Sequence, residues 1–348
     1  MTEIRPEIGA RGALAQTLAD SPELFPHALD LRSGMVTLLR LTRADYQQAG
    51  FLDGRIAGPA KPARTMAFAE LADAVGTAGL PESCDFIFHI GHVGSTLLSR
   101  LLGRHPTLFS VREPEILRTL ALARNENIAA SHLPALLKLW SRTYDAGARA
   151  VVKASSFVSD LADQILMRNY APRALVMGIA PETYLATIFG GANSPAEARA
   201  LAPFRLARLR ARLCCAWPIE DMSEGEIVAL GWACEASALA AAAAQFAGRV
   251  HVMDFDRFLA RPQESLGAAF EHFGVAAADK EIDDLLAGPE MRTYSKAPEF
   301  AYDTALRQSV LDEGRSRHAR EIRRGLQWLD RGAREYKQLQ AAFELFPS

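Results

Sequence analysis

Residues 85–98 read Asp-Phe-Ile-Phe-His-Ile-Gly-His-Val-Gly-Ser-Thr-Leu-Leu, and they decide the fold. The apolar run Phe86–Ile90 is typical of a strand that is buried on both faces. The leucines after the second glycine recur at helical spacing, which predicts a helix from about Ser95. Gly91 and Gly94 allow the backbone to approach an anion closely, and the free N–H groups of the first helical turn point toward it. The stretch therefore predicts a strand, a glycine loop and a helix that together bind a phosphate-like anion.

The loop differs from the Walker A motif of ATP- and GTP-binding proteins. That motif has about four residues between its glycines and a lysine after the second one. Here two residues separate Gly91 from Gly94, and Ser95 stands in place of the lysine. The lost charge disfavours an ordinary ATPase or GTPase, and a tight turn without a ligand is the alternative interpretation. The candidate anion-binding residues are Gly91, His92, Val93, Gly94, Ser95 and Thr96.

The composition is that of a globular protein with a large core. Of the 348 residues, 49% are hydrophobic and 23% are charged, and the formal net charge is -2. Because positive charge is not in excess, nucleic acid is disfavoured as a partner. No apolar run approaches the length of a membrane span, so no membrane partner is expected. Glu3, Arg5 and Glu7 are not followed by the apolar core of a signal peptide.

The cysteine pattern indicates a reduced compartment. The four cysteines contain no Cys-x-x-Cys pair, which fits a cytoplasmic protein better than a disulfide framework or a zinc site. No cluster with metal-ligand spacing is apparent, so no metal is expected. The cysteines are Cys84, Cys214, Cys215 and Cys234.

Strands and helices alternate after the glycine loop. Further buried strands are predicted at Leu108–Val111, Ala148–Ser156, Ala174–Ala180 and Arg249–Phe255. Such alternation is typical of an α/β fold in which helices cover both faces of a parallel sheet. We therefore expect a three-layer α/β architecture like that of P-loop proteins, with about five parallel strands flanked by helices and additions at both ends.

Three parts are expected along the chain. Residues 1–80 form an N-terminal accessory region with an edge strand near residues 35–41. The nucleotide-binding α/β domain occupies residues 81–287, and residues 288–348 form a C-terminal loop and helices packed on it. One amphipathic helix is predicted over residues 321–346, and its apolar face offers a surface for a homodimer.

Two other helices have distinctive compositions. Arg205, Arg208 and Arg212 share one helical face, which is expected to be solvated rather than to bind an anionic substrate. An alanine-rich segment over residues 227–246 is predicted to be a core helix, because small side chains allow close packing.

Charged residues follow the second and third predicted strands. In open α/β sheets, ligands bind beyond the carboxyl ends of the strands. Arg112, Glu113 and Lys153 are therefore expected on the same rim as the glycine loop. For Arg112 and Glu113, a functional role is favoured over a solvated strand end. Lys153 fits an anion-binding lysine and a snorkelling lysine at a sheet edge equally well.

Three features together resemble the sulfotransferase family in its bacterial form. They are the compact loop ending in Gly-Ser-Thr-Leu-Leu, the Glu-Pro after the second strand, and Val252–Pro262 followed by a helix ending in Phe-x-x-Phe-Gly. The match covers roughly residues 85–275. It implies transfer of a sulfuryl group from 3′-phosphoadenosine-5′-phosphosulfate (PAPS) to a hydroxyl or amine of a small-molecule acceptor. Adenosine 3′,5′-bisphosphate (PAP) would be the product, and no metal would be required.

The resemblance also implies roles for particular residues. Backbone N–H groups at positions 94–96 would bind the 5′-phosphosulfate. His92 stands where the family usually has Lys or Arg, and a histidine donates only when protonated or in the right tautomer. Glu113 stands where bacterial relatives have the general base. With His92, Lys153 would offset charge on the transferring group and the leaving phosphate.

Two positions near the fourth strand depart from the family pattern. An arginine and a serine usually hold the 3′-phosphate of PAPS there, and this chain has Ile179 and Thr187. Thr187 can replace the serine, but an alkyl chain cannot replace a bidentate arginine. Either another cation reaches the 3′-phosphate, such as Arg292 or Lys296 from the C-terminal loop, or the donor has no 3′-phosphate.

Two other functions stay open on the same scaffold. A phosphotransferase that uses ATP or another nucleotide would explain Ile179, although the loop lacks the Walker lysine. A non-catalytic nucleotide-binding protein would use the loop alone, and the presence of Glu113 and Lys153 disfavours it. No segment identifies the acceptor.

Overall fold

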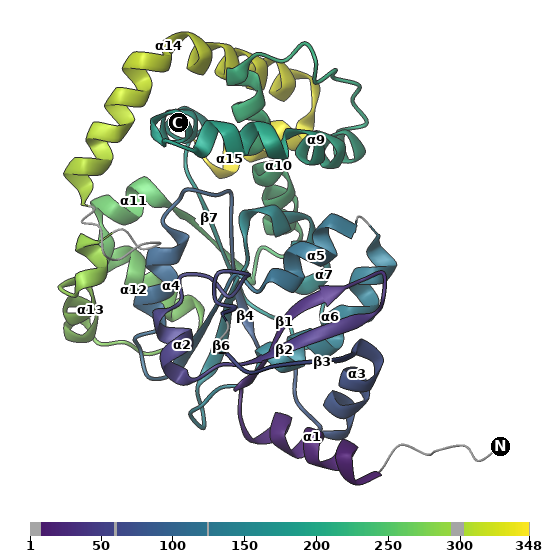
Figure 1. The fold of residues 1–348 in the computed structure, drawn as a ribbon. Coiled ribbons are helices and arrows are strands. Elements are labelled where there is room, and N and C mark those ends of the chain that lie inside the picture. The colour runs from purple at the N-terminus through teal and green to yellow at the C-terminus, as the bar shows by residue number, and fades with distance from the viewer. Residues whose placement is uncertain (1–7, 59–60, 124, 294–302, 348) are drawn as a thin grey trace. The chain divides into compact units, whose positions relative to one another are not determined.

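In the computed structural model, the five predicted strands form one parallel sheet in the order β5-β6-β4-β7-β8. Figure 1 labels β6, β4 and β7 of this sheet. They are β4 (Asp85–His89), β5 (Leu108–Arg112), β6 (Arg149–Lys153), β7 (Ala174–Gly178) and β8 (Val250–Asp254). Every residue of β4 and β7 is buried, as is typical of parallel strands covered on both faces. The predicted α/β class, with a five-stranded parallel sheet flanked by helices, is confirmed.

Two compact units interleave along the sequence. The structure describes residues 8–58, 61–123, 125–293 and 303–347. The first unit contains Met1–Ile87 and Leu98–Pro172, and the second contains Phe88–Leu97 and Arg173–Ser348. The glycine loop therefore belongs to the second unit, together with the C-terminal half of the chain. The three-part division at residues 80 and 287 stays a prediction.

Helices alternate with the strands of the parallel sheet, as predicted. In the first half of the chain they are α1 (Ile8–Asp20), α2 (Arg43–Gln48), α3 (Phe68–Thr77), α4 (Ser95–Leu102), α5 (Glu115–Ala123), α6 (Glu126–Trp140), the 3₁₀ helix η1 (Ser156–Leu161) and α7 (Ala162–Leu166). In the second half they are α8 (Pro181–Gly190), α9 (Ser194–Leu213), α10 (Glu224–Gln245), α11 (Phe255–Ala260), α12 (Pro262–His272), α13 (Asp279–Leu286), the 3₁₀ helix η2 (Pro289–Arg292), α14 (Thr304–Glu335) and α15 (Lys337–Leu345).

The N-terminal region forms a second, antiparallel sheet within the first unit. Its strands are β1 (Leu24–Asp30), β2 (Met35–Arg40) and β3 (Ala63–Ala67), in the order β1-β2-β3. The sequence predicts only β2, and the expectation that it is an edge strand is wrong, because β2 pairs with β1 on one side and β3 on the other. In β1 the register shifts between Pro26 and Ala28, and such an irregularity interrupts the alternation by which a strand is predicted.

The alanine-rich helix α10 is a core helix, as predicted. This helix has 22 residues, and the mean hydropathy of its most apolar window is 1.6. By length and composition alone, it could cross a membrane. This corrects the expectation that no run of the chain approaches that length. However, 78% of the window is buried inside the protein, as in the core helix of a soluble protein.

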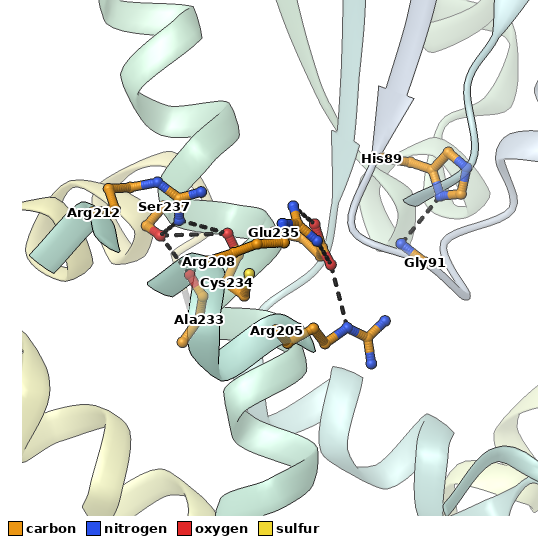
Figure 2. Close-up of polar contacts among 9 residues, drawn as sticks. All are labelled: His89, Gly91, Arg205, Arg208, Arg212, Ala233, Cys234, Glu235 and Ser237. Atoms are coloured by element: carbon orange, nitrogen blue, oxygen red, sulfur yellow. Dashed lines mark hydrogen bonds and ion pairs between the residues drawn. The ribbon is translucent and has the colours of Figure 1, made fainter. Parts of the chain in front are cut away.

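On the arginine-rich face of α9, Arg205 and Arg208 are buried and Arg212 is half-buried, which corrects the expectation of a solvated face (Figure 2). Glu235 of α10 is fully buried and accepts hydrogen bonds from Arg208 Nη1 and Nη2 (3.0 and 2.8 Å) and from Arg205 Nε (3.2 Å). Arg212 donates to Ser237 Oγ (2.8 Å). The partner carboxylate lies among alanines in a different helix, so the periodicity of α9 alone does not reveal it.

The single C-terminal helix predicted over residues 321–346 is divided into α14 and α15. The break is at Tyr336, whose φ of -122° and ψ of 115° are extended. The ring of Tyr336 packs edge-on against Trp217, with 5.3 Å between centroids. Apolar residues continue on both sides of this contact, so the sequence pattern runs across it. In the first half of α14, the helix packs closely on α8, because a Cβ at Gly314 would lie 2.4 Å from the Ala186 carbonyl oxygen.

Candidate anion-binding and catalytic site

The glycine loop joins β4 to α4 and contains three residues with a left-handed backbone. The φ angle is 92° at Gly91, 58° at His92 and 64° at Gly94. Glycine adopts such angles readily, but a histidine must be held in them by its surroundings. A Cβ at Gly94 would lie 2.0 Å from Cε2 of Phe255, so the ring leaves no space for a side chain there. The backbone of the loop is therefore closely specified.

His89, at the end of β4, fixes the start of the loop (Figure 2). Its ring is buried, and its Nδ1 accepts a hydrogen bond from the Gly91 N–H (3.1 Å). That N–H is engaged inside the protein, so the amides left to bind an anion lie further along the loop. In the sequence, His89 reads only as part of an apolar strand, because a contact with a loop leaves no periodic signal.

Two buried hydroxyl residues begin α4. Ser95 is 5% exposed and Thr96 is 2% exposed. Thr96 Oγ1 has no hydrogen-bond partner within the described part of the chain. A buried polar group without a partner costs about 1–3 kcal/mol. A phosphate or sulfate oxygen at this helix N-terminus would satisfy the hydroxyl, so the residues fit the predicted anion.

Glu113 and Lys153, in the first unit, form an ion pair. Lys153 Nζ donates to Glu113 Oε1, and the lysine side chain is fully buried. The Glu113 N–H donates to the Lys153 carbonyl (2.6 Å). Glu113 has a left-handed φ of 51°, and conformations of this kind cluster at functional sites. Lys153 is therefore not a snorkelling surface lysine, because its amino group is buried against a carboxylate.

The register of the sheet places this pair at the strand ends. Arg112 of β5 and Ile87 of β4 both pair with Lys153 of β6. The pair therefore stands at the carboxyl ends of neighbouring parallel strands, where ligands bind in open α/β sheets. From Ile87 the chain continues through the end of β4 into the glycine loop.

Arg112 has a structural role, which corrects the functional role expected for it. Its side chain is 3% exposed and donates to main-chain carbonyls within residues 46–49, including that of Ala49 (Nε–O 2.8 Å). Burial lowers the pKa of Arg112 to about 9. The Leu52 N–H donates in return to the Arg112 carbonyl (2.7 Å). These bonds attach the N-terminal region to the residue that precedes Glu113.

Phe51 brings an aromatic ring to the ion pair. Lys153 Nζ lies 5.6 Å from the ring centroid, and the Arg55 guanidinium carbon lies 3.4 Å from it. Cations are attracted to the face of an aromatic ring. The N-terminal accessory region, in which the sequence shows no chemical motif, thus contributes to the surroundings of the predicted base. The contact joins segments that are far apart in the sequence, so no local pattern announces it.

The remaining predicted residues lie in the second unit and do not form a recognisable cluster. Thr187 Oγ1 donates to a carbonyl one turn earlier in α8 (2.7 Å). Ile179 is fully buried, and its carbonyl accepts from Trp232 Nε1 (3.0 Å), so this position belongs to the core. Arg292 is exposed at the end of η2, and Lys296 falls outside the described residues. Within the described ranges, no group of three or more His, Cys, Asp or Glu is arranged to hold a metal ion.

Comparisons with known proteins find sulfotransferases at a large distance. No family model and no curated protein matches the sequence. Similar solved structures include the sulfotransferase domain from the curacin biosynthetic pathway, at 15% identity over 67% of this chain and 90% of that chain (TM-score 0.40). The sulfotransferase domain from the Synechococcus PCC 7002 olefin synthase has 14% identity over 68% and 88% (TM-score 0.39). A sulfotransferase from Alicyclobacillus acidocaldarius has 15% identity over 70% and 96% (TM-score 0.36).

These structures carry the name of the family that the sequence resembles.

Proposed function

We propose that the protein is a sulfotransferase that moves a sulfuryl group from PAPS to a hydroxyl or amine of a small-molecule acceptor. The glycine loop is the observation that carries this proposal. Its left-handed backbone leads into a buried helix N-terminus, where the described residues offer no partner to the Thr96 hydroxyl. A concave array of backbone N–H groups binds an anion without needing the Walker lysine.

The residues of the chain have separate roles in this proposal. The amides at positions 94–96 bind and orient the donor, which supplies an activated sulfuryl group when bound. Glu113 accepts the proton of the attacking hydroxyl or amine. Lys153 and His92 offset negative charge on the transferring group and the leaving phosphate. As in phosphoryl transfer, positioning and electrostatics contribute most of the rate enhancement.

The acceptor is proposed to meet the N-terminal region beside Glu113. Phe51 lies there, but it is only 9% exposed and Arg55 covers its ring. Arg55 pairs with Asp53 (Nε–Oδ1 2.9 Å), and 60% of the Arg55 side chain is exposed. The guanidinium group of Arg55 would therefore offer the acceptor a polar contact.

Location and oligomeric state complete the proposal. None of the four cysteines, all of which lie in the described residues, forms a disulfide. This agrees with a protein of the cytoplasm, where thiols stay reduced. Formation of a homodimer through the C-terminal helices stays a prediction.

A thermal-shift titration tests the proposed donor. The protein is melted with PAP, with 5′-AMP, and with ADP or ATP in the presence and absence of Mg²⁺. A ligand at about 100 times its Kd stabilises the fold by about 2.7 kcal/mol, so its binding is readily seen. We expect PAP to raise the Tm more than 5′-AMP does at equal concentration.

The other outcomes identify the alternatives. A rise in Tm with Mg²⁺-bound ADP or ATP alone would contradict the proposal and indicate a phosphotransferase. Tight binding of PAP, without transfer from PAPS to any of a panel of hydroxyl and amine acceptors, would indicate a non-catalytic nucleotide-binding protein.

A further inference from the structure

The second unit contains a pocket of about 270 Å³ that is lined by residues of α8, α11 and α14. Two arginines of α14, Arg307 and Arg315, line it with Leu311 between them. Residues at this spacing share one face of a helix. Thr183 of α8 adds a hydroxyl and Asp256 of α11 adds a carboxylate. The pocket therefore combines two guanidinium groups with other polar side chains, which is a composition suited to an anionic ligand.

Arg307 connects this pocket to the glycine loop. Its guanidinium carbon lies 5.2 Å from the centroid of the Phe255 ring. The same ring fills the space beside Gly94, where a Cβ would lie 2.0 Å from it. One aromatic ring therefore contacts both the guanidinium and the glycine loop.

Carboxylates hold both arginines in position. Arg307 Nη2 donates to Asp256 Oδ1 (2.5 Å), and only 12% of the Arg307 side chain is exposed. Arg315 donates through Nε and Nη2 to Glu182 (3.0 and 2.9 Å) and through Nη1 to Asp312 (3.4 Å). A guanidinium has five N–H donors. Asp256 accepts a hydrogen bond from only one nitrogen of Arg307. The arginine side chain can therefore bind an anion while it keeps its carboxylate partner.

We propose that Arg307, assisted by Arg315, binds the 3′-phosphate of the donor. This inference rests on the proposed function and extends it. Ile179, where the family usually has an arginine, is fully buried and hydrogen-bonded to Trp232 through its carbonyl, so it cannot serve. The two arginines would supply guanidinium N–H donors from α14 instead. They replace the exposed Arg292 as the cation for this phosphate.

Binding of two nucleotides that differ only in the 3′-phosphate tests this assignment. The Kd values of PAP and 5′-AMP are measured by calorimetry for the wild type and for Arg307→Ala. Hydrogen bonds to a charged group contribute about 1.5–3 kcal/mol. We therefore expect Arg307→Ala to weaken PAP binding by about 10- to 100-fold and to leave 5′-AMP binding unchanged. Arg307→Lys keeps the positive charge but loses the planar guanidinium group, so its Kd for PAP should lie between those of the wild type and Arg307→Ala.

Arg317→Ala is the matched control. Arg317 lies on the same helix, is 72% exposed and pairs with Glu313, so its loss should not alter either Kd. Melting each variant without ligand confirms that it is folded. Equal effects of Arg307→Ala on PAP and 5′-AMP, or no effect on either, would overturn the assignment. A wild type that binds neither nucleotide would instead overturn the proposed function.

Discussion

The conformation of Glu113 is stabilised by its neighbours. Its N–H donates to the Lys153 carbonyl, its carboxylate accepts from Lys153 Nζ, and the carbonyl just before it is bonded to the Leu52 N–H. A residue in a sparsely populated backbone region costs of order 1–3 kcal/mol. The contacts offset that cost and fix the direction of the carboxylate, as a base requires.

Replacing Glu113 by glutamine tests whether it is the base. Glu113→Gln keeps the size of the side chain but removes its ability to take a proton, so kcat should fall by about 100- to 10,000-fold. The Kd for PAP should change little, because in the proposed function the loop binds the donor. Turnover of PAPS with an accepted hydroxyl or amine is the measurement. Glu115→Gln, two residues later in α5, is the control and should retain normal kcat.

The residues of the candidate site could be predicted only where they lie at the end of a recognisable strand. Glu113 and Lys153 come at the ends of two predicted strands, and parallel strands bring such positions to one edge, where the two side chains form their ion pair. His89 and Phe51 could not be found in this way. His89 looks like any residue of a buried strand, and Phe51 reaches Lys153 only through tertiary folding.

Secondary-structure elements could likewise be predicted where they have a local sequence pattern, but not where they depend on tertiary contacts. The five strands of the parallel sheet are short apolar runs between turn residues, so the sequence predicts them closely. The burial of the α9 face could not be predicted from α9, since it depends on Glu235 in α10. Tyr336 breaks a continuous apolar pattern because its ring has a partner in Trp217.

The Glu235 cluster should be important for stability. Its carboxylate is fully buried, and the side chains of Arg205 and Arg208 are 8% and 4% exposed. Glu235→Gln removes the negative charge that two buried guanidinium groups share, and breaking a buried ion pair typically costs about 3–5 kcal/mol. The free energy of unfolding, measured by urea denaturation, should fall by that amount.

An exposed ion pair between the same two helices provides the comparison. Arg199 of α9 and Glu224 of α10 pair at 2.5 Å, with 61% and 38% of their side chains exposed. Glu224→Gln should cost less than about 1 kcal/mol, because solvent screens such pairs. If Glu235→Gln and Glu224→Gln lowered the free energy of unfolding equally, burial would not strengthen the Glu235 cluster.

The two compact units do not correspond to two continuous halves of the sequence. Residues 88–97 carry the glycine loop and belong with the C-terminal unit, whereas Glu113 and Lys153 belong with the N-terminal unit. The boundary falls within β4, whose residues 85–87 belong to the first unit and residues 88–89 to the second. A linear pattern predicts the strands but not this grouping, because the grouping depends on which strands become neighbours.

Global stability should depend on pH through one buried histidine, His27, and two half-buried ones, His251 and His272. Burial lowers the pKa of His272 to about 4, and the neighbouring His251 lowers it further. Burial also lowers the pKa of His251 and of His27. An unfolded histidine has a pKa of about 6.5. Between about pH 6.5 and 4 the unfolded chain therefore binds more protons, so the free energy of unfolding falls as the pH falls.

His272→Gln isolates the main contribution. His272 Nε2 lies 3.0 Å from the Ala174 carbonyl, and a glutamine amide can donate there without titrating. We expect the wild type to lose more stability than His272→Gln when the pH is lowered from about 7.5 to about 5. Urea midpoints of both proteins at the two pH values measure this difference, so any loss common to both pH values cancels. Identical losses on acidification would show that His272 is not held neutral by the fold, and the pH response would then belong to other groups.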